Sequence, residues 1–251
     1  MKIRIKFRKY GTMKFIGHLD VMRYFQKAIR RADVDVCYSG GFSPHQIMSF
    51  AAPLGVGITS RGEYVDIEVA STKDSETMKK CLNGVMSEGF EIVSYRGLPD
   101  DAANAMSIVG AGDYTLAFRT GYEPEDMDKE TWFQGLIAFF ERPSVMVTKK
   151  TKRGEKEMDL KPLVYELRIC PEGDGEMKGP RLFMKISAGS AANVKPEQVL
   201  DAYYGFLGKE RPPFAFMVQR EEVYADRASD AEKEAGIHSF ISLEQLGEEI
   251  R

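Results

Sequence analysis

Residues 2–9 alternate strictly between basic and apolar side chains, and no other segment constrains the fold as strongly. The even-numbered positions are basic and the odd-numbered positions are apolar: Lys2, Arg4, Lys6 and Arg8 alternate with Ile3, Ile5 and Phe7. Successive side chains of a β-strand point to opposite faces of the sheet. The segment therefore predicts a strand with one buried face and one basic face.

The next segment, from His18 to Ala32, changes to helical spacing. Its apolar and basic positions form two separate stripes, Met22, Phe25, Ile29 and Ala32 against Arg23, Lys27, Arg30 and Arg31. Residues three and four apart share one face of a helix. We therefore expect a helix with one side in the core and one basic side.

The remaining pattern predicts an α+β protein of two tandem ferredoxin-like (βαββαβ) halves, with antiparallel sheets and helices on one face. In the first half, strands are expected at 34–38, 63–69 and 90–95, a Gly/Pro-rich segment at 39–62, and a helix at 74–86. A linker at 97–101 precedes a similar order of elements. The expected boundaries are 1–98 for a basic domain, 105–225 for a second domain, and 226–251 for an acidic tail.

Charge is distributed unevenly along the chain. The first 61 residues hold eleven Lys and Arg and three acids, a local charge of +8, whereas the other 190 hold 24 bases and 35 acids, a charge of −11. Clustered cations favour a polyanionic partner. Two alternatives stay open: Asp66 and Glu68 on a neighbouring strand could neutralise the first strand, or the acidic tail could shield the basic end.

Composition excludes several classes of protein. The start lacks a continuous apolar core, and the longest apolar stretch, 48–58, is interrupted by Pro53, Gly55 and Gly57, so we expect no export signal or membrane span. Cys37, Cys81 and Cys170 are widely separated, which favours reduced thiols in the cytoplasm. No metal-ligand spacing is found, so we expect no metal and no cofactor.

Three sequence blocks carry a family resemblance. They are Phe15–Arg23 (FIGHLDVMR), Tyr38–His45 (YSGGFSPH) and Ser49–Val56 (SFAAPLGV), with weaker matches at Asp159–Leu163 and Lys195–Leu200. In combination they resemble the bacterial radical-SAM-linked protein family of unknown function. The resemblance implies a partnership with a cobalamin-type radical SAM protein, and this chain lacks the CxxxCxxC motif that such a catalyst needs.

The start of the predicted helix is the first candidate binding site. His18 is expected where backbone N–H groups attract anions. Arg23 and Lys27 follow one and two turns later, so His18, Arg23 and Lys27 could hold a phosphate, and Asp20 is counted with them among the candidate ligand-binding residues. Alternatively, His18 only caps the helix and hydrogen-bonds Asp20 or the loop.

The glycine-rich block after the helix is the second candidate. Its glycines allow a ligand to approach the backbone, and its aromatic residues offer stacking surfaces. The block could equally be a connector that packs Phe42 inward. The candidate residues are Tyr38, Gly40, Gly41, Phe42, Ser43, Pro44 and His45.

A second basic group lies at a predicted hairpin. Lys149 and Lys150, followed by Lys152 and Arg153, could clamp a nucleic-acid backbone or could simply be solvated. The segment Ser187–Asn193 could cradle a phosphate, although it matches no phosphate-loop fingerprint.

These features predict an accessory binding module, RNA-facing and without catalytic residues of its own, which acts with a radical SAM modification enzyme. One alternative is a protein-interaction adaptor that binds no nucleic acid. Another is a metal-independent RNA-processing nuclease with His18 as catalyst, which rests on analogy of fold alone. The sequence leaves the oligomeric state open.

Overall fold

The structure, a computed structural model, describes the 251-residue chain except residues 152–153, 174–176 and 190–191. For residues 149–151, 155–156 and 171–172 it describes the backbone alone. The chain forms a mixed α/β protein with extensive, mostly antiparallel sheet. The chain divides into two compact units: unit 1 comprises residues 1–110 and 220–251, and unit 2 comprises residues 111–219.

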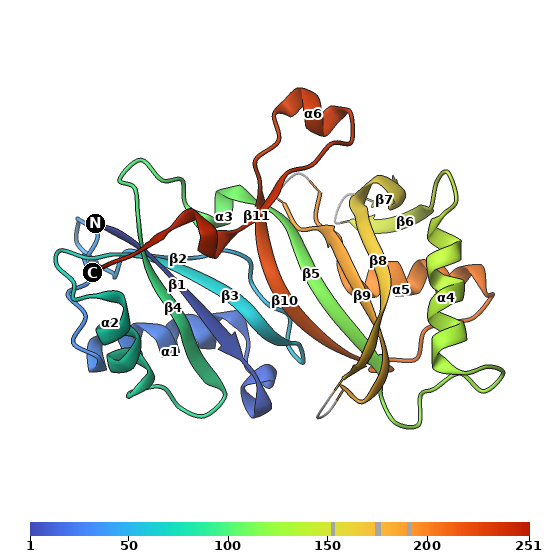
Figure 1. Ribbon diagram of the computed structural model, residues 1–251, viewed down its shortest axis with the longest axis horizontal. Coiled ribbons are helices and arrows are strands. Elements are labelled where there is room, and N and C mark those ends of the chain that lie inside the picture. The colour runs from blue at the N-terminus through green and yellow to red at the C-terminus, as the bar shows by residue number, and fades with distance from the viewer. Residues whose placement is uncertain (152–153, 174–176, 190–191) are drawn as a thin grey trace. The chain divides into compact units, whose positions relative to one another are not determined.

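Unit 1 is built from both ends of the chain (Figure 1). Its amino-terminal elements are β1 (Lys2–Lys9), the 3₁₀ helix η1 (Gly11–Phe15), α1 (His18–Arg31), β2 (Met48–Phe50), β3 (Thr59–Glu68), α2 (Ser75–Asn83), β4 (Phe90–Leu98) and α3 (Ala105–Ile108). Its carboxyl-terminal elements are the second part of β10 (Phe216–Asp226), α6 (Asp230–Glu234), β11 (Phe240–Ser242), the 3₁₀ helix η4 (Leu243–Leu246) and β12 (Glu248–Glu249).

The sheet of unit 1 has β1 in the middle. β1 pairs antiparallel with β3 on one side and with β4 on the other, and β2 pairs with the far edge of β3. Ile3, Ile5 and Phe7 are buried against α1 and α2, as the alternating pattern predicts. Phe25 of α1 packs on Phe7 with ring centroids 4.5 Å apart. The α1 helix (His18–Arg31) confirms the prediction from helical spacing.

The second strand of the fold lies elsewhere than the sequence predicts. Residues 34–38 make only isolated bridges, Val36 to Val69 and Tyr38 to Gln46, and the strand is β2 (Met48–Phe50), inside the segment expected to be loop. Three residues are too few for an alternating pattern to be recognised. The bridge from Tyr38 to Gln46 instead closes a loop between α1 and β2.

The carboxyl-terminal segment is an ordered part of unit 1. β11 pairs with β10, and β12 pairs with the edge strand β4 through Glu248 to Gly97 and Glu249 to Arg96. Leu243 of η4 is fully buried. Ser75 N–H donates to Ile250 O at 3.0 Å, and Ile250 N–H donates to Ser75 Oγ at 2.8 Å. These two hydrogen bonds hold the carboxyl-terminal segment at the start of α2.

Unit 2 has its own sheet and core. Its elements are β5 (Val109–Phe118), α4 (Lys129–Phe140), β6 (Met146–Thr151), β7 (Gly154–Asp159), the 3₁₀ helix η2 (Lys161–Leu163), β8 (Val164–Gly173), β9 (Gly179–Ser187), α5 (Pro196–Phe206) and the start of β10. The strand order is β5-β9-β8, with residues 216–219 of β10 beside β5, and β6 and β7 form a separate hairpin.

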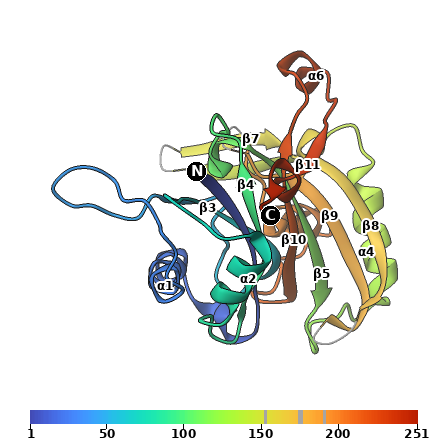
Figure 2. The same ribbon diagram turned by 60° about the vertical axis from the view of Figure 1, so that its left-hand side comes forward.

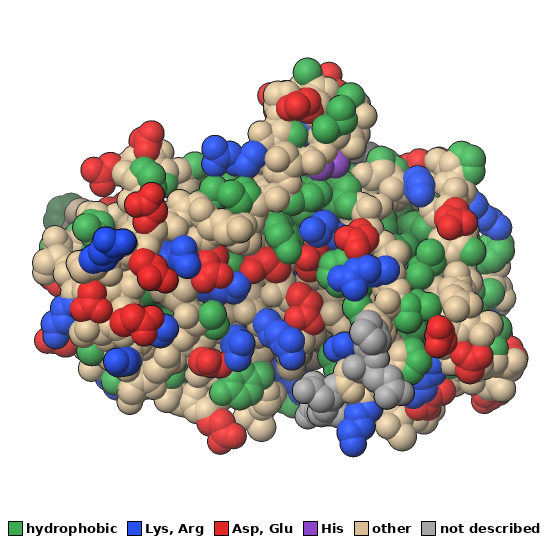
Figure 3. Space-filling model, in the orientation of Figure 1, with side chains coloured by type: hydrophobic (Ala, Val, Ile, Leu, Met, Phe, Trp, Pro, Cys, Tyr) green, Lys and Arg blue, Asp and Glu red, His purple; other side chains and the backbone are tan. Residues whose placement is uncertain are grey.

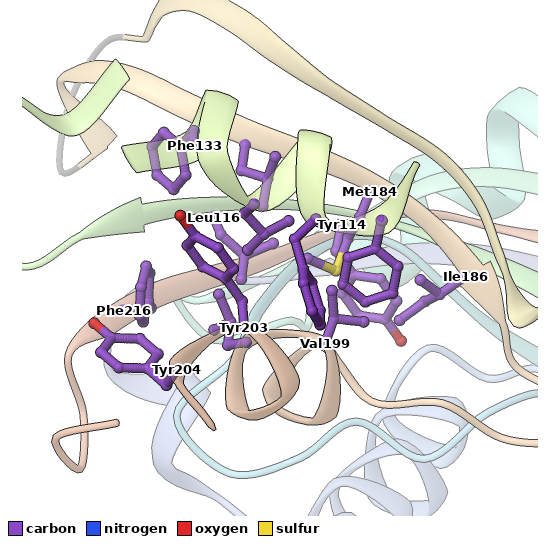
Figure 4. Packing of buried hydrophobic residues seen from close by; sticks show 14 of the residues in the cluster. Tyr114, Leu116, Phe133, Met184, Ile186, Val199, Tyr203, Tyr204 and Phe216 are labelled. Carbon is purple, nitrogen blue, oxygen red and sulfur yellow. The ribbon is translucent and has the colours of Figure 1, made fainter. Parts of the chain in front are cut away.

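Aromatic side chains fill the core of unit 2 (Figure 4). Trp132 of α4 packs edge-on against Tyr203 of α5 at 4.9 Å, and Phe118 of β5 lies 4.4 Å from Phe216. Aromatic groups of this size dominate the burial energy of a core. The α4 helix begins at Lys129 because Asp128 accepts a hydrogen bond from Thr131 N at 2.9 Å and caps it.

Candidate functional site

The basic face of β1 is covered and paired, which corrects the expectation that its cations face solvent. Arg4 is 2% exposed and forms a two-point ion pair with Asp66: Nε to Oδ1 at 2.8 Å and NH2 to Oδ2 at 2.9 Å. Its NH1 donates to Leu243 O of η4 at 3.2 Å. Asp66 stands opposite Arg4 in the β1–β3 register, so the alternative of cross-strand neutralisation is confirmed for this residue.

Lys6 is paired by two carboxylates from the end of the chain. Its Nζ donates to Glu222 Oε2 at 2.7 Å and to Glu244 Oε2 at 2.9 Å. Burial alone would lower the pKa of Lys6, but hydrogen bonds and attraction from Glu222 and Glu244 outweigh it and raise the pKa above 10.5. Tyr64 donates to Glu222 Oε1 at 2.5 Å, and burial together with that carboxylate raises its pKa.

The other cations of β1 also have partners. Lys2 Nζ donates to Ala102 O at 2.8 Å, and Lys9 Nζ donates to Ile16 O at 3.0 Å. Arg8 pairs with Glu91 at 3.0 Å in solvent. Figure 3 shows the result over β1, β3 and β4, where blue and red side chains are interleaved instead of forming one basic patch. A phosphate backbone therefore has little to gain on this face.

The cations of α1 differ from those of β1. Arg23, Lys27, Arg30 and Arg31 are all exposed. Arg23 makes a loose pair with Asp20 at 3.5 Å, and Arg31 donates to Val85 O at 3.1 Å. Within the described residues, Lys27 and Arg30 meet no carboxylate at ion-pair distance. The basic stripe predicted for this helix is thus present and faces water.

His18 begins α1 but does not cap it. The N-cap is Gly17, and no side chain caps the helix. The imidazole of His18 lies edge-on to the ring of Phe50, with centroids 5.2 Å apart. His18 therefore packs against β2, and the first turn of α1 carries Asp20 as its acidic residue, which opposes anion binding at that point.

The loop between α1 and β2 extends away from the sheet (Figure 2). Ser39 N–H donates to His45 O at 2.8 Å, and Ser39 Oγ lies 2.8 Å from His45 Nδ1, so the loop is closed at its base. Phe42 at its tip is fully exposed, which contradicts the inward-packing alternative. The other candidate loop residues are exposed as well: Tyr38, Gly40, Gly41, Ser43, Pro44 and His45.

A hydrogen bond connects the base of this loop to α1. Gln46 is buried, and its Nε2 donates to Gln26 O at 3.3 Å. The same carbonyl accepts from Arg30 Nε at 3.2 Å. The base of the loop at Gln46 and the cation Arg30 therefore meet at one backbone carbonyl of α1. We call Arg23, Lys27, Arg30 and the loop 38–46 the helix–loop surface.

The structure brings together only part of the predicted site. His45 lines a pocket of about 390 Å³ with Lys2, Glu68 and Asn104, and His18, Arg23 and Phe42 are not among the residues that line this pocket. Glu68, Ser49 and Asn104 were not predicted as pocket residues from the sequence. They come close to His45 only through the pairing of the strands and the path of residues 102–104, which local patterns do not indicate.

The second basic group lies on the β6–β7 hairpin of unit 2. Lys149 and Lys150 pair with Lys156 and Glu155 in the backbone register. The side chains of Lys149 and Lys150, and all of residues 152–153, lie outside the described residues, so their binding role stays a prediction. In the segment Ser187–Asn193, Ser187 donates to Ala192 O at 2.6 Å.

An exposed apolar group also escaped the sequence analysis. Phe15, Leu19 and Val56 are each more than half exposed. Gly57 N–H donates to Lys14 O at 2.7 Å, which brings the Val56 segment against the end of η1. Phe15 and Val56 directly follow and precede the two bonded residues, and contiguous exposed apolar side chains commonly mark a contact with a partner.

Fold and surface together define a mixed α/β protein of antiparallel sheet with a basic helix beside a projecting loop. Residues 2–196 match the model of a family described as an uncharacterized protein conserved in bacteria (DUF2344), and the chain belongs to this family. The description does not mention a radical SAM protein, so that partnership stays a prediction. No curated protein matches the chain.

Two further findings concern the residues that the structure describes. No three His, Cys, Asp or Glu side chains in this part of the chain form a group that could hold a metal ion. None of the helices that the structure describes has the length and apolar composition to cross a membrane.

Proposed function

We propose that this protein is an accessory module that binds single-stranded RNA through the helix–loop surface and acts with a radical SAM modification enzyme. The observation that carries the proposal is the fully exposed Phe42 on a loop whose base is bonded to the basic helix α1. An aromatic ring that stacks on a base stabilises binding by about 1–3 kcal/mol. Nearby cations attract the phosphates.

Electrostatics restrict the proposed contact to α1. The cations of β1 are paired inside unit 1, so the exposed cations Arg23, Lys27 and Arg30 are the ones placed to meet an RNA strand. Three cations can neutralise few phosphates. We therefore expect weak, salt-dependent binding, as suits a module that presents RNA to an enzyme.

The fold and the partner belong to the same proposal. Unit 1 has the strand order β4-β1-β3-β2 with α1 and α2 on one face, which supports a ferredoxin-like arrangement. Unit 2, with β6–β7 as an inserted hairpin, supports a second one. The radical SAM partner rests on the resemblance of Phe15–Arg23, Tyr38–His45 and Ser49–Val56.

Fluorescence anisotropy with a labelled U-rich RNA over a salt series tests the proposal. The double variant Lys27→Gln, Arg30→Gln should lower the slope of log affinity against log salt by about 0.7 for each phosphate that the variant no longer neutralises. The matched control is Lys73→Gln, Lys80→Gln, two exposed lysines before and on α2, and it should keep the slope. A chain with no RNA affinity at low salt would remove the proposal.

A protein-interaction adaptor is the second candidate, and the apolar group Phe15, Leu19 and Val56 favours it. A partner protein would cover these side chains, whereas RNA would gain little from them. Co-purification with the radical SAM protein after nuclease treatment tests this candidate. Association that survives nuclease and is abolished in Leu19→Ser supports the adaptor, and association that nuclease abolishes contradicts it.

A further inference from the structure

The pocket beside His45 lies on the face of the unit 1 sheet opposite α1 and α2. It has a volume of about 390 Å³, within the range of about 300–1,000 Å³ in which proteins hold small organic ligands. Lys2 and Glu68 stand opposite one another in the β1–β3 register and both line it. Ile47, Ala102 and Ala103 supply apolar walls.

The two carboxylates of this pocket differ. Asp66 is satisfied, because it accepts from Arg4 with both oxygens and from Ala105 N–H at 2.8 Å. Glu68 is partly buried, and among the described residues its carboxylate meets no hydrogen-bond donor or cation. Glu68 therefore offers two acceptor oxygens to a ligand.

Donors stand beside this acceptor. Lys2 Nζ is held in place by Ala102 O at 2.8 Å, and a lysine ammonium has two further protons to donate. Ser39 Oγ accepts from His45 N–H at 3.1 Å and lies 2.8 Å from His45 Nδ1, so its own proton can be donated to Nδ1 and the imidazole keeps a proton on Nε2. Asn104 Oδ1 accepts from Ser49 Oγ at 2.9 Å and from Met106 N–H at 3.0 Å, which leaves the amide NH₂ of Asn104 to donate.

We infer that this pocket binds a guanine ring, with Glu68 accepting from its N1–H and N2–H and Lys2 donating to its O6. The charge of Lys2 offsets that of the unpartnered Glu68 carboxylate, so the pocket favours a neutral ligand. The lysine needs an acceptor on this ligand, and the two carboxylate oxygens need two parallel donors beside it. The Watson–Crick edge of guanine has this order, and single-stranded RNA exposes that edge. The source of the guanine as RNA rests on the proposed function.

Isothermal titration calorimetry with guanosine, inosine and adenosine on the full chain tests the inference. These nucleosides lack phosphate, so the cations of α1 contribute nothing to the comparison. Guanosine should bind, and inosine, which lacks the N2 amino group, should bind at least about tenfold more weakly, because it cannot make one of the hydrogen bonds to the charged Glu68. Adenosine should be weaker still.

Glu68→Gln should weaken guanosine at least about tenfold, and Glu88→Gln, an exposed glutamate after α2 that does not line the pocket, should leave it unchanged. Equal affinity for the three nucleosides, no binding of any, or guanosine binding that Glu68→Gln leaves intact would overturn the inference. If U-rich RNA still binds in that case, the proposed function stands without the pocket. Guanosine binding by a chain that binds no RNA would keep the pocket and remove the proposed function.

Discussion

Lys6 Nζ of the first strand lies 2.9 Å from Glu244 Oε2, so this amino-terminal cation is neutralised by a carboxylate 238 residues away in the sequence. Glu222 completes the arrangement at 2.7 Å from the same nitrogen. Part of the positive charge near the amino terminus is therefore balanced by carboxylates of the acidic carboxyl-terminal segment within the same chain. The exposed cations of α1, by contrast, remain available to a partner.

This ion pair makes the stability of unit 1 depend on pH. Burial alone would raise the pKa of Glu244. Hydrogen bonds from Lys6 and Ser94 and the charges of Lys6 and Arg96 outweigh this effect, so the pKa of Glu244 lies below 4.5. A lowered carboxyl pKa stabilises the fold above pH 4.5, and this contribution is lost as the pH falls through the folded value. The raised pKa of Lys6 contributes below pH 10.5 and is lost as the pH rises through its folded value.

Urea unfolding over a pH series measures this effect. We expect Glu244→Gln to flatten the acid part of the curve and to weaken its alkaline fall, because Lys6 is left with one carboxylate instead of two. Glu234→Gln, an exposed acid of α6, serves as the control and should keep the wild-type curve. Identical pH curves for Glu244→Gln and the wild type would contradict the assignment.

The Arg4–Asp66 pair should be among the most sensitive points of unit 1. Asp66→Asn leaves the guanidinium of Arg4 buried without its carboxylate, and removing one partner of a buried pair costs about 3–5 kcal/mol. The free energy of unfolding in urea should fall by that amount. Asp101→Asn, at an exposed position, should change it by less than about 0.5 kcal/mol, and equal effects would show that Arg4 is not held as described.

β3 and β10 approach closely at Gly62, and we therefore expect a larger side chain at this position to destabilise the protein. A Cβ on Gly62 would lie 2.7 Å from Glu221 O and 2.9 Å from Glu222 Cα, and both of these are backbone atoms. Gly62→Ala should lower the free energy of unfolding by about 1–3 kcal/mol. Gly40→Ala, where a Cβ meets nothing within 4 Å, is the matched control. A Gly62→Ala protein as stable as the control would mean that the strands are farther apart.

The sequence predicts the local elements of unit 1 better than their long-range contacts. Alternation over residues 2–9 and helical spacing after His18 each depend on near neighbours in the chain, and both elements are present. The partners of Lys6 come from positions more than 200 residues away, and β11 and β12 have three and two residues, too few to carry a pattern. The exposure of Phe42 was one of two readings of the same glycine-rich block, and only the fold decides between them.

Phe42→Ala should separate binding from stability. The ring is fully exposed, so the free energy of unfolding should stay within about 0.5 kcal/mol of wild type. Without one stacked base, RNA binding should weaken about tenfold. Phe15→Ala removes another exposed ring, outside the helix–loop surface, and should leave RNA affinity unchanged. Equal effects of both variants on affinity would contradict the assignment of Phe42.

Lysine acetylation read by mass spectrometry, with and without U-rich RNA, tests the central claim most directly. We predict that Lys27 is acetylated readily in the protein alone and is protected by RNA, whereas Lys6 and Lys9 resist acetylation in both states and Lys73 is acetylated in both. Acetylation of Lys6 as fast as that of Lys27, or no protection of Lys27 by RNA, would contradict a protein whose first strand is neutralised internally and whose first helix holds the ligand.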